Sequence, residues 1–310
     1  MRKLIGVLLG LTLLAVATVL VGPNFIDWNN YKDEVTRRVK EMTGRDLAIN
    51  GNIRVAFLPA PALVASDVSL ANLDGATARD MVTLKSAEIR VALAPLLGGQ
   101  VKVETLKLIE PVIHLEILSD GSANWEFEAV KGGTGGDANP TASVATRAGQ
   151  NSAPPIAFDN LTIENATLIY RNSVSSVTER IEKLSAQITA ASLQGPMETI
   201  GSATVRGVPL NFNLNVGEII HDRTVPFKLR AGAVAGNVTG RVGGMLVNLT
   251  EVPKFKGNVK VEGEDLAATL ASISVVGVPS SLAQSFYVGG DVTATAAEVQ
   301  MVNVDIGLGT

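Results

Sequence analysis

Two histidines are the first side chains to consider for catalysis, because an imidazole titrates near neutral pH. His114 lies between Ile113 and Leu115 in a stretch where polar and apolar residues alternate, and His221 lies in a His-Asp-Arg sequence typical of a turn. Neither histidine belongs to a recognisable set of nucleophile, base and orienting group. We therefore expect a structural or solvated role for both and predict no catalytic residues.

The other residues that could act as nucleophiles or bind a metal or phosphate do not indicate such a site. The chain has no cysteine, which excludes thiolate nucleophiles and cysteine-based zinc sites. Glu262, Glu264 and Asp265 form an acidic cluster of the kind that hard cations prefer, but a solvated loop is the favoured interpretation. The glycine-rich segments 132–136 and 243–244 lack the strand-to-helix setting of a phosphate loop. The sequence predicts no metal, no cofactor and no enzymatic activity.

Composition points to an apolar chain without a nucleic-acid partner. Of the 310 residues, 46% are apolar, 18% are charged and 4% are aromatic. The formal net charge of −4 argues against nucleic acid, since phosphate binding needs a basic face. Such an aliphatic content can fill a core or line a long apolar surface.

The amino terminus predicts export and a membrane anchor. The apolar segment 4–22 is long enough to span a bilayer, at roughly 28 Å for about 19 helical residues. Arg2 and Lys3 precede it, and cationic flanks stay cytoplasmic, so the rest of the chain should lie on the far side. The alternative is a cleaved signal peptide, because Ala15-Val16-Ala17 has the small-x-small pattern of a cleavage site.

A short amphipathic helix is predicted over residues 24–44. Asp27 can cap its start and Gly44 can end it. Its apolar stripe consists of Trp28, Tyr31, Val35, Val39 and Met42. The stripe can pack on the following sheet, or Trp28 and Tyr31 can sit at the membrane interface, and both can hold together.

From residue 45 onward, apolar and polar residues alternate at a period of two, which predicts strands with one apolar face. In residues 95–125 the pattern breaks at Pro111 and ends at the turn Asp120-Gly121. The apolar residues expected on this face are Val101, Val103, Ile113, Leu115, Ile117, Leu161, Ile163, Leu210, Phe212, Leu214 and Val216. From the residues alone, the favoured explanation is a sandwich, in which two such faces cover each other. The alternative explanation is an open groove.

Residues 131–155 interrupt the pattern with a tract rich in Gly, Ala, Ser, Thr and Asn. Such a tract buries too little apolar area to offset its ordering entropy, which predicts a flexible linker. The expected organisation is an anchor over 1–22, a helix and β module over 23–130, the linker over 131–155 and a second β module over 156–310.

Two motif-bearing segments resemble the N-terminal portion of the AsmA family. Residues 51–72 combine a Gly-x-Ile-x-Val strand, a Pro-x-Pro element and a Val-x-Leu-x-Asn strand. Residues 95–125 combine a Pro-Leu-Leu-x-Gly start, Val-x-Val, Leu-x-Leu and Pro-x-Ile-x-Leu strands, and a closing Gly121-x-x-Asn124-Trp125. The anchor and the helix precede them in the family's order. Family members generally continue much further, so we expect the 310 residues to be the leading part of a longer architecture or a truncated one, with residues 156–310 continuing the β-groove.

The resemblance favours the open groove. It implies a mainly β fold in which a transmembrane helix and a short amphipathic helix precede an elongated, curled antiparallel sheet. It also implies an inner-membrane protein with its bulk in the periplasm, which carries phospholipid toward the outer membrane. The listed apolar residues would line the track, and Arg2, Lys3, Trp28 and Tyr31 would lie at the membrane. The alternative is an assembly factor that engages outer-membrane or periplasmic proteins through exposed strand edges.

Overall fold

A computed structural model describes residues 27–56, 61–92, 103–127, 158–190, 195–218, 224–247, 254–295 and 298–309. The predicted anchor over 1–22 with Arg2 and Lys3, the predicted linker over 131–155, Val101 and His221 lie outside the described residues. The predictions made for them therefore stay predictions.

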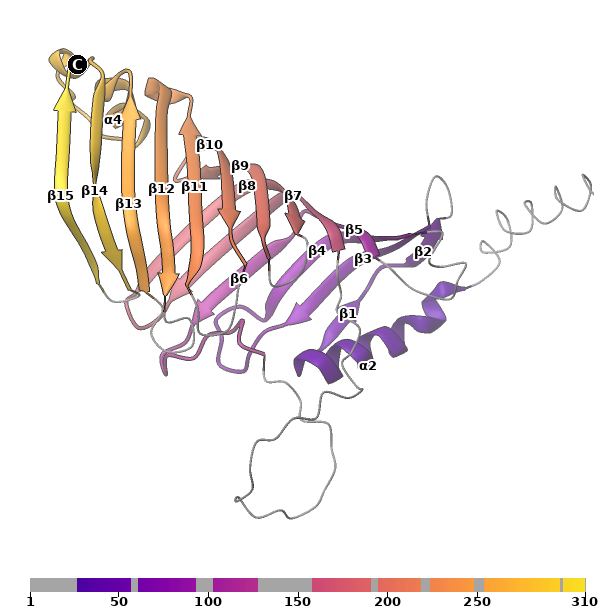
Figure 1. The fold of residues 1–310 in the computed structure, drawn as a ribbon. Helices are drawn as coiled ribbons and strands as arrows, with labels where there is room; N and C mark the ends of the chain where they lie inside the picture. Colours follow the sequence, from indigo (N-terminus) through magenta and orange to yellow (C-terminus); the bar gives the residue numbers. More distant parts are fainter. Residues whose placement is uncertain are drawn as a thin grey trace, which may run out of the picture.

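The chain is built almost entirely from strands (Figure 1). The helical elements are η2 (Trp28–Tyr31), α2 (Lys32–Thr43), η3 (Ala235–Asn237), α4 (Leu266–Ser272) and η4 (Ser280–Leu282). The strands are β1 (Leu47–Ile49), β2 (Ile53–Ala56), β3 (Ala62–Ala71), β4 (Asp80–Val91), β5 (Val103–Ile109), β6 (Val112–Ile117), β7 (Phe158–Asn172), β8 (Val177–Ala190), β9 (Met197–Val205), β10 (Val208–Val216), β11 (Val225–Ala233), β12 (Val238–Val247), β13 (Lys254–Gly263), β14 (Phe286–Ala294) and β15 (Val299–Leu308).

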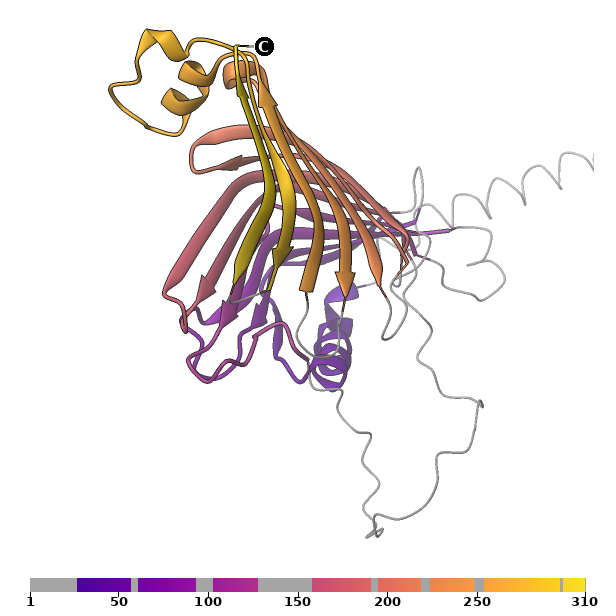
Figure 2. The same cartoon turned by 60° about the vertical axis from the view of Figure 1, so that its left-hand side comes forward.

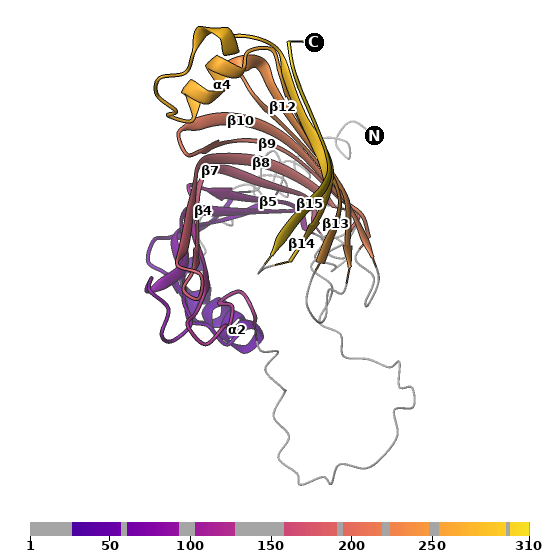
Figure 3. The same cartoon turned by 90° about the vertical axis from the view of Figure 1, so that its left-hand side faces the viewer.

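All 15 strands of the described residues belong to one sheet. From β7 to β15 each strand pairs antiparallel with the next, as a long meander. Figures 2 and 3 show this sheet twisting and bending into an arch, so that β3–β5 and β12–β15 run in very different directions. The prediction of a mainly β chain with one curled sheet is confirmed.

One part of the predicted topology is wrong, because the sheet is not antiparallel throughout. Both β5 and β6 pair with β7 in parallel. Parallel neighbours need a crossover connection of a dozen or more residues, and the stretch between Ile117 and Phe158 is long enough. Periodicity reports which face a residue occupies but does not report strand direction.

Pro111 separates β5 from β6, as the sequence predicted, yet the two strands lie end to end beside β7. The break is held by backbone hydrogen bonds on both sides, from Glu110 N to Glu164 O (2.8 Å) and from Thr167 N to Pro111 O (2.8 Å). Proline has no N–H to give to a ladder, so a strand end is the place for it.

Residues with a left-handed backbone conformation recur where the alternation of apolar and polar residues shifts by one position. Asp67 in β3, Glu110 before β6, Asn165 in β7 and Lys183 in β8 have φ between 50° and 54°. At Asn165 and Lys183 the pairing register also shifts, which marks a bulge that moves by one the residues facing a given side. The shift keeps apolar residues on one face although the alternation slips, as in β7, where Ile163 is followed on that face by Ala166.

The predicted helix over 24–44 is confirmed in outline as η2 followed by α2. The Asp27 carboxylate accepts a hydrogen bond from Asn29 N (3.0 Å), and Gly44 ends α2 with φ of 71°. The stripe is only partly covered: Trp28 packs against Ile53, Ala65 and Val68, whereas Tyr31 and Met42 are each 55% exposed. The packing interpretation therefore holds for Trp28.

Candidate functional site

The pairing register shows which side chains share a face, because residues directly opposite on neighbouring strands point the same way. One row crosses the sheet from β2 to β15 and contains only apolar residues and glycine. It consists of Ile53, Ala65, Ala87, Leu108, Ile163, Ala186, Gly201, Phe212, Ala231, Gly240, Val261, Val288 and Ile306.

Two further rows on the same face have the same character. The second contains one polar residue, Thr199, among Val55, Leu63, Ile89, Leu106, Leu161, Ile188, Leu214, Leu229, Val242, Val259 and Gly290. The third is Leu47, Leu70, Val82, Ile113, Leu168, Ile181, Val205 and Val208. We call this side of the sheet the apolar face.

The structure places the described track residues of the sequence analysis on the apolar face, except Val103, which pairs with Val91 across a register shift and is not assigned to a face. Ile163 and Phe212 lie in the first row, Leu161 and Leu214 in the second, and Ile113 in the third. The others extend these rows: Leu115 opposite Tyr170, Ile117 opposite Asn172, Leu210 opposite Ala233 and Val216 opposite Phe227.

The apolar face is half-buried rather than covered by a second layer. Phe212, Leu214, Leu229, Val242 and Val259 all keep part of their surface exposed. Because all described strands lie in the same sheet, no second sheet packs over this face within the described part of the chain. The sandwich that the residues alone favoured is therefore wrong for these residues.

Aromatic side chains cover parts of the apolar face. Trp28 packs onto it at the β1–β3 end, and the Trp28 and Tyr31 rings lie 5.8 Å apart. The Trp125 ring lies 6.4 Å from Tyr170, which is opposite Leu115. The Phe212 ring lies over Gly201, where a Cβ atom would come within 2.7 Å of it. At this position the ring therefore occupies the space that the glycine leaves free.

The closing Gly121-x-x-Asn124-Trp125 motif fixes the end of β6 through a buried amide. The Asn124 side chain is 0% exposed, accepts from Glu116 N (2.9 Å) and donates to His114 O (2.8 Å) and Asn72 Oδ1 (2.9 Å). Arg45, also buried, donates to Asn124 O at 2.9 Å and stacks on Phe127. The motif thus supports the structure of the first part of the sheet.

Sequence reasoning missed the role of Glu116 in this cluster. Its carboxylate accepts from Thr77 N (2.8 Å) and the Thr77 hydroxyl (2.7 Å), and Arg171 lies 3.7 Å away. Burial acts to raise the pKa of Glu116, but the Thr77 hydrogen bonds and the Arg171 charge outweigh it and lower the pKa. A polar residue that alternates with apolar ones gives no sequence signal of being buried.

Two of the three acidic residues that the sequence offered for a cation have other partners. Glu262 pairs with Lys260 and Arg241, and the Asp265 carboxylate caps α4 by accepting from Ala268 N (2.8 Å). Within the described ranges, no group of three His, Asp or Glu side chains is placed to hold a metal ion. His114 lies in β6 on the side opposite the apolar face.

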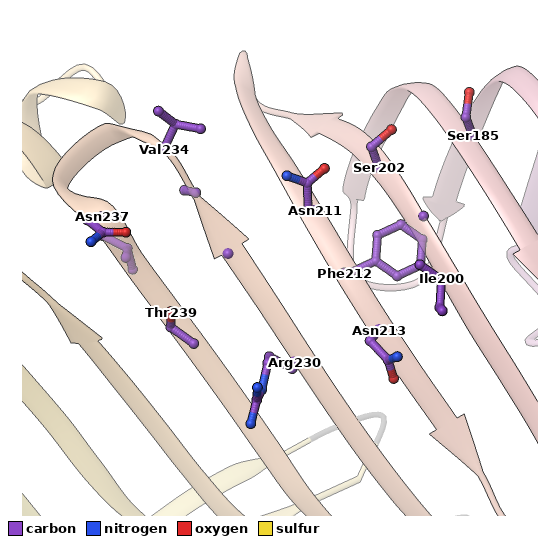
Figure 4. A pocket seen from close by; sticks show the side chains of 14 residues that line it. Ser185, Ile200, Ser202, Asn211, Phe212, Asn213, Arg230, Val234, Asn237 and Thr239 are labelled. Atoms are coloured by element: carbon purple, nitrogen blue, oxygen red, sulfur yellow. The ribbon is translucent and has the colours of Figure 1, made fainter.

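The opposite side of the sheet is polar, and we call it the polar face. Asn211, Asn213 and Asn215 of β10 lie on it, as the alternation predicted. A hollow of about 900 Å³ lies over this side of β8–β12, and Figure 4 shows Ser202, Asn211, Asn213 and Arg230 around it on neighbouring strands.

A single sheet with one apolar and one polar face defines the chain as a mainly β protein built on one large sheet. The model of the AsmA family matches residues 1–251, so the chain belongs to the AsmA family. The AsmA family protein YhjG of Escherichia coli K12 is 24% identical to it over 251 residues, which cover 76% of this chain and 33% of the relative. The chain thus spans about a third of that relative's length. No solved structure gives a significant match.

Helices able to cross a membrane are absent from the described residues, since none of those helices is both long and apolar enough. The predicted span over 1–22 lies outside them.

Proposed function

We propose that this protein is anchored in the bacterial inner membrane and carries phospholipid toward the outer membrane, with acyl chains lying along the apolar face. The AsmA family is linked broadly to outer-membrane biogenesis and lipid transport. In this proposal Arg2 and Lys3 stay cytoplasmic, Trp28 and Tyr31 lie near the membrane surface, and the sheet stands in the periplasm. The phospholipid and the inner membrane are its partners.

The continuity of the apolar face carries this proposal. Each CH₂ group removed from water contributes about 0.8 kcal/mol, so full exposure of two acyl chains costs on the order of 20 kcal/mol. Rows of aliphatic side chains that continue from strand to strand lower this cost at each step of the path. They offer no polar pocket that would hold one lipid tightly, which suits passage better than storage.

The test uses photoreactive residues on the two sides of β6. A probe at Ile113, on the apolar face, is expected to crosslink phospholipid several-fold more than a probe at the adjacent His114. Adding Leu214→Asp, which puts a charge on the apolar face of β10, should lower the lipid yield at Ile113. Asn211→Asp on the opposite side of the same strand is the matched control and should leave the yield unchanged.

Equal lipid crosslinking at Ile113 and His114 would sink the proposal, as would full lipid yield in a folded Leu214→Asp variant. Cooperative unfolding of each variant establishes that it is folded. The same experiment examines the assembly-factor alternative, which one observation favours: β15 is a sheet edge with exposed apolar residues, among them Val304. Protein crosslinks from a probe at Val304, without lipid crosslinks at Ile113, would favour that alternative.

A further inference from the structure

Basic and amide side chains form a compact group on the polar face of β10–β13. The register sets Asn213 opposite Arg230, Arg230 opposite Arg241, and Arg241 opposite Lys260. The neighbouring row runs Asn215, Lys228, Gly243 and Asn258. We call these eight residues the cationic grid. It contains four cations and three amides around one glycine.

The cationic grid surrounds a hollow on this side of the sheet. A cavity of about 460 Å³ is lined by Asn213, Asn215, Lys228, Arg230, Arg241, Gly243 and Asn258 together with Leu229 and Val242. Gly243 leaves the floor open, because a Cβ atom there would lie 3.3 Å from Asn258 Oδ1. The cavity adjoins the larger hollow of Figure 4, with which it shares Asn213 and Arg230.

The grid places like charges against one another. Directly opposite residues have Cβ atoms about 5 Å apart, and like charges at such positions destabilise a sheet. Arg230, Arg241 and Lys260 occupy three such positions in a row across β11, β12 and β13. The arrangement is unexpected in a chain whose net charge is −4.

Within the described part of the chain, the cationic grid forms ion pairs with an acidic side chain at one end. Glu262 pairs with Arg241 and with Lys260 (2.9 Å). Lys228 and Arg230 make no ion pair or side-chain hydrogen bond with any described residue. At the rim, the Glu198 carboxylate accepts a hydrogen bond from the Asn213 side chain (3.3 Å). Asp291 lies directly opposite Asn258. Among the described residues, these two cations at the centre therefore have no counter-ion, and both line the cavity of about 460 Å³.

We propose that the cationic grid binds the phosphate of a phosphorylated polyol headgroup. Arg230 and Lys228 supply charge-assisted hydrogen bonds to phosphate oxygens. The amides of Asn213, Asn215 and Asn258 can donate to and accept from hydroxyl groups. The site lies on the side of the sheet opposite the proposed acyl track, so it is independent of the proposed function. The headgroup can belong to a lipid or to a soluble molecule.

Calorimetric titration of the full chain in detergent tests the site with two probes, inorganic pyrophosphate and short-chain phosphatidylglycerol, with short-chain phosphatidylcholine as the neutral comparison. Arg230→Gln is expected to weaken binding about tenfold, because it removes one charge-assisted contact. Gly243→Ala should also weaken it, since the added methyl group narrows the floor without changing charge. Arg54→Gln, at an exposed arginine on β2, is the matched control and should bind like the wild type.

Each outcome assigns the site or overturns it. Pyrophosphate binding that Arg230→Gln weakens identifies a soluble phosphate source, whereas an effect on phosphatidylglycerol alone identifies a lipid-borne one. Equal affinities of wild type and a folded Arg230→Gln variant for both probes, or no binding of either, overturn the proposal. Leu214→Asp should leave pyrophosphate binding unchanged, so failure of the site can be distinguished from failure of the acyl track.

Discussion

Individual buried polar residues decide how the first part of the sheet is held together. Asn124 satisfies donors and acceptors from β6 and from the loop after β3, and its carbonyl accepts from Arg45 just before β1. A buried polar group left without a partner costs about 1–3 kcal/mol, so a side chain that satisfies several at once is hard to replace. This explains physically why an asparagine stands at this point of the motif.

Glu116 should make stability depend on pH. The Thr77 hydrogen bonds and Arg171 lower its pKa in the folded state, against the raising effect of burial. Its ionisation therefore stabilises the fold above the unfolded pKa of about 4.3, and this contribution is lost as the pH falls through the lower, folded-state pKa. The free-energy difference between wild type and Glu116→Gln, measured by urea unfolding, should be largest near neutral pH and shrink in acid.

The Thr77 hydroxyl provides the control for that measurement. Thr77→Val removes one of the two Thr77 donors to Glu116. It should therefore lose only part of the pH-dependent stability that Glu116→Gln loses. A wild-type to Glu116→Gln difference that stays constant between neutral and acidic pH would contradict the assigned cause.

At the scale of elements, alternation predicted the faces of the strands but not their connections. Leu214 and Asn215 were assigned to opposite sides correctly, because the side-chain period of a strand is two. The parallel pairing of β6 with β7 could not be predicted, since it depends on a long crossover rather than on local pattern. The bulges at Asn165 and Lys183 appear in the sequence only as slips in the alternation, which do not by themselves indicate a left-handed backbone.

Glycines in the first row of the apolar face should differ sharply in their tolerance of alanine. A Cβ atom at Gly201 would lie 2.5 Å from Ser185 O and 2.7 Å from Phe212 Cζ, so backbone and ring must both shift. We expect Gly201→Ala to destabilise the protein by about 1–3 kcal/mol through overpacking. Gly240→Ala is the matched control, because its nearest neighbour, Ala231 O, is 3.9 Å away.

Gly240→Ala should be close to neutral or slightly stabilising, as it reduces the entropy of the unfolded chain. Denaturant midpoints of both variants check the pair. Equal midpoints would contradict the overpacking expected at Gly201.

At the scale of the whole molecule, the apolar face was predictable and the cationic grid was not. Runs such as Leu210, Phe212 and Leu214 mark one side of a strand from local spacing alone. Arg230, Arg241 and Lys260 lie far apart in sequence, and only the register of β11–β13 brings them side by side. Local pattern likewise left open whether a second sheet covers the apolar face, because a covered core and an open track have the same alternation.

The open apolar face should be detectable in the folded protein in solution. Exposed apolar patches larger than a few hundred Å² are uncommon in soluble monomers and mark binding sites. We expect the folded chain to enhance the fluorescence of an apolar dye without denaturant, while its unfolding stays cooperative, which separates this behaviour from a molten globule.

Leu214→Asp combined with Leu229→Asp charges two directly opposite residues and should reduce the signal several-fold. Asn211→Asp combined with Thr239→Asp, on the polar face, should not. Dye fluorescence that rises only on unfolding would mean that the face is covered in the native protein, and the acyl track would then have no access to lipid.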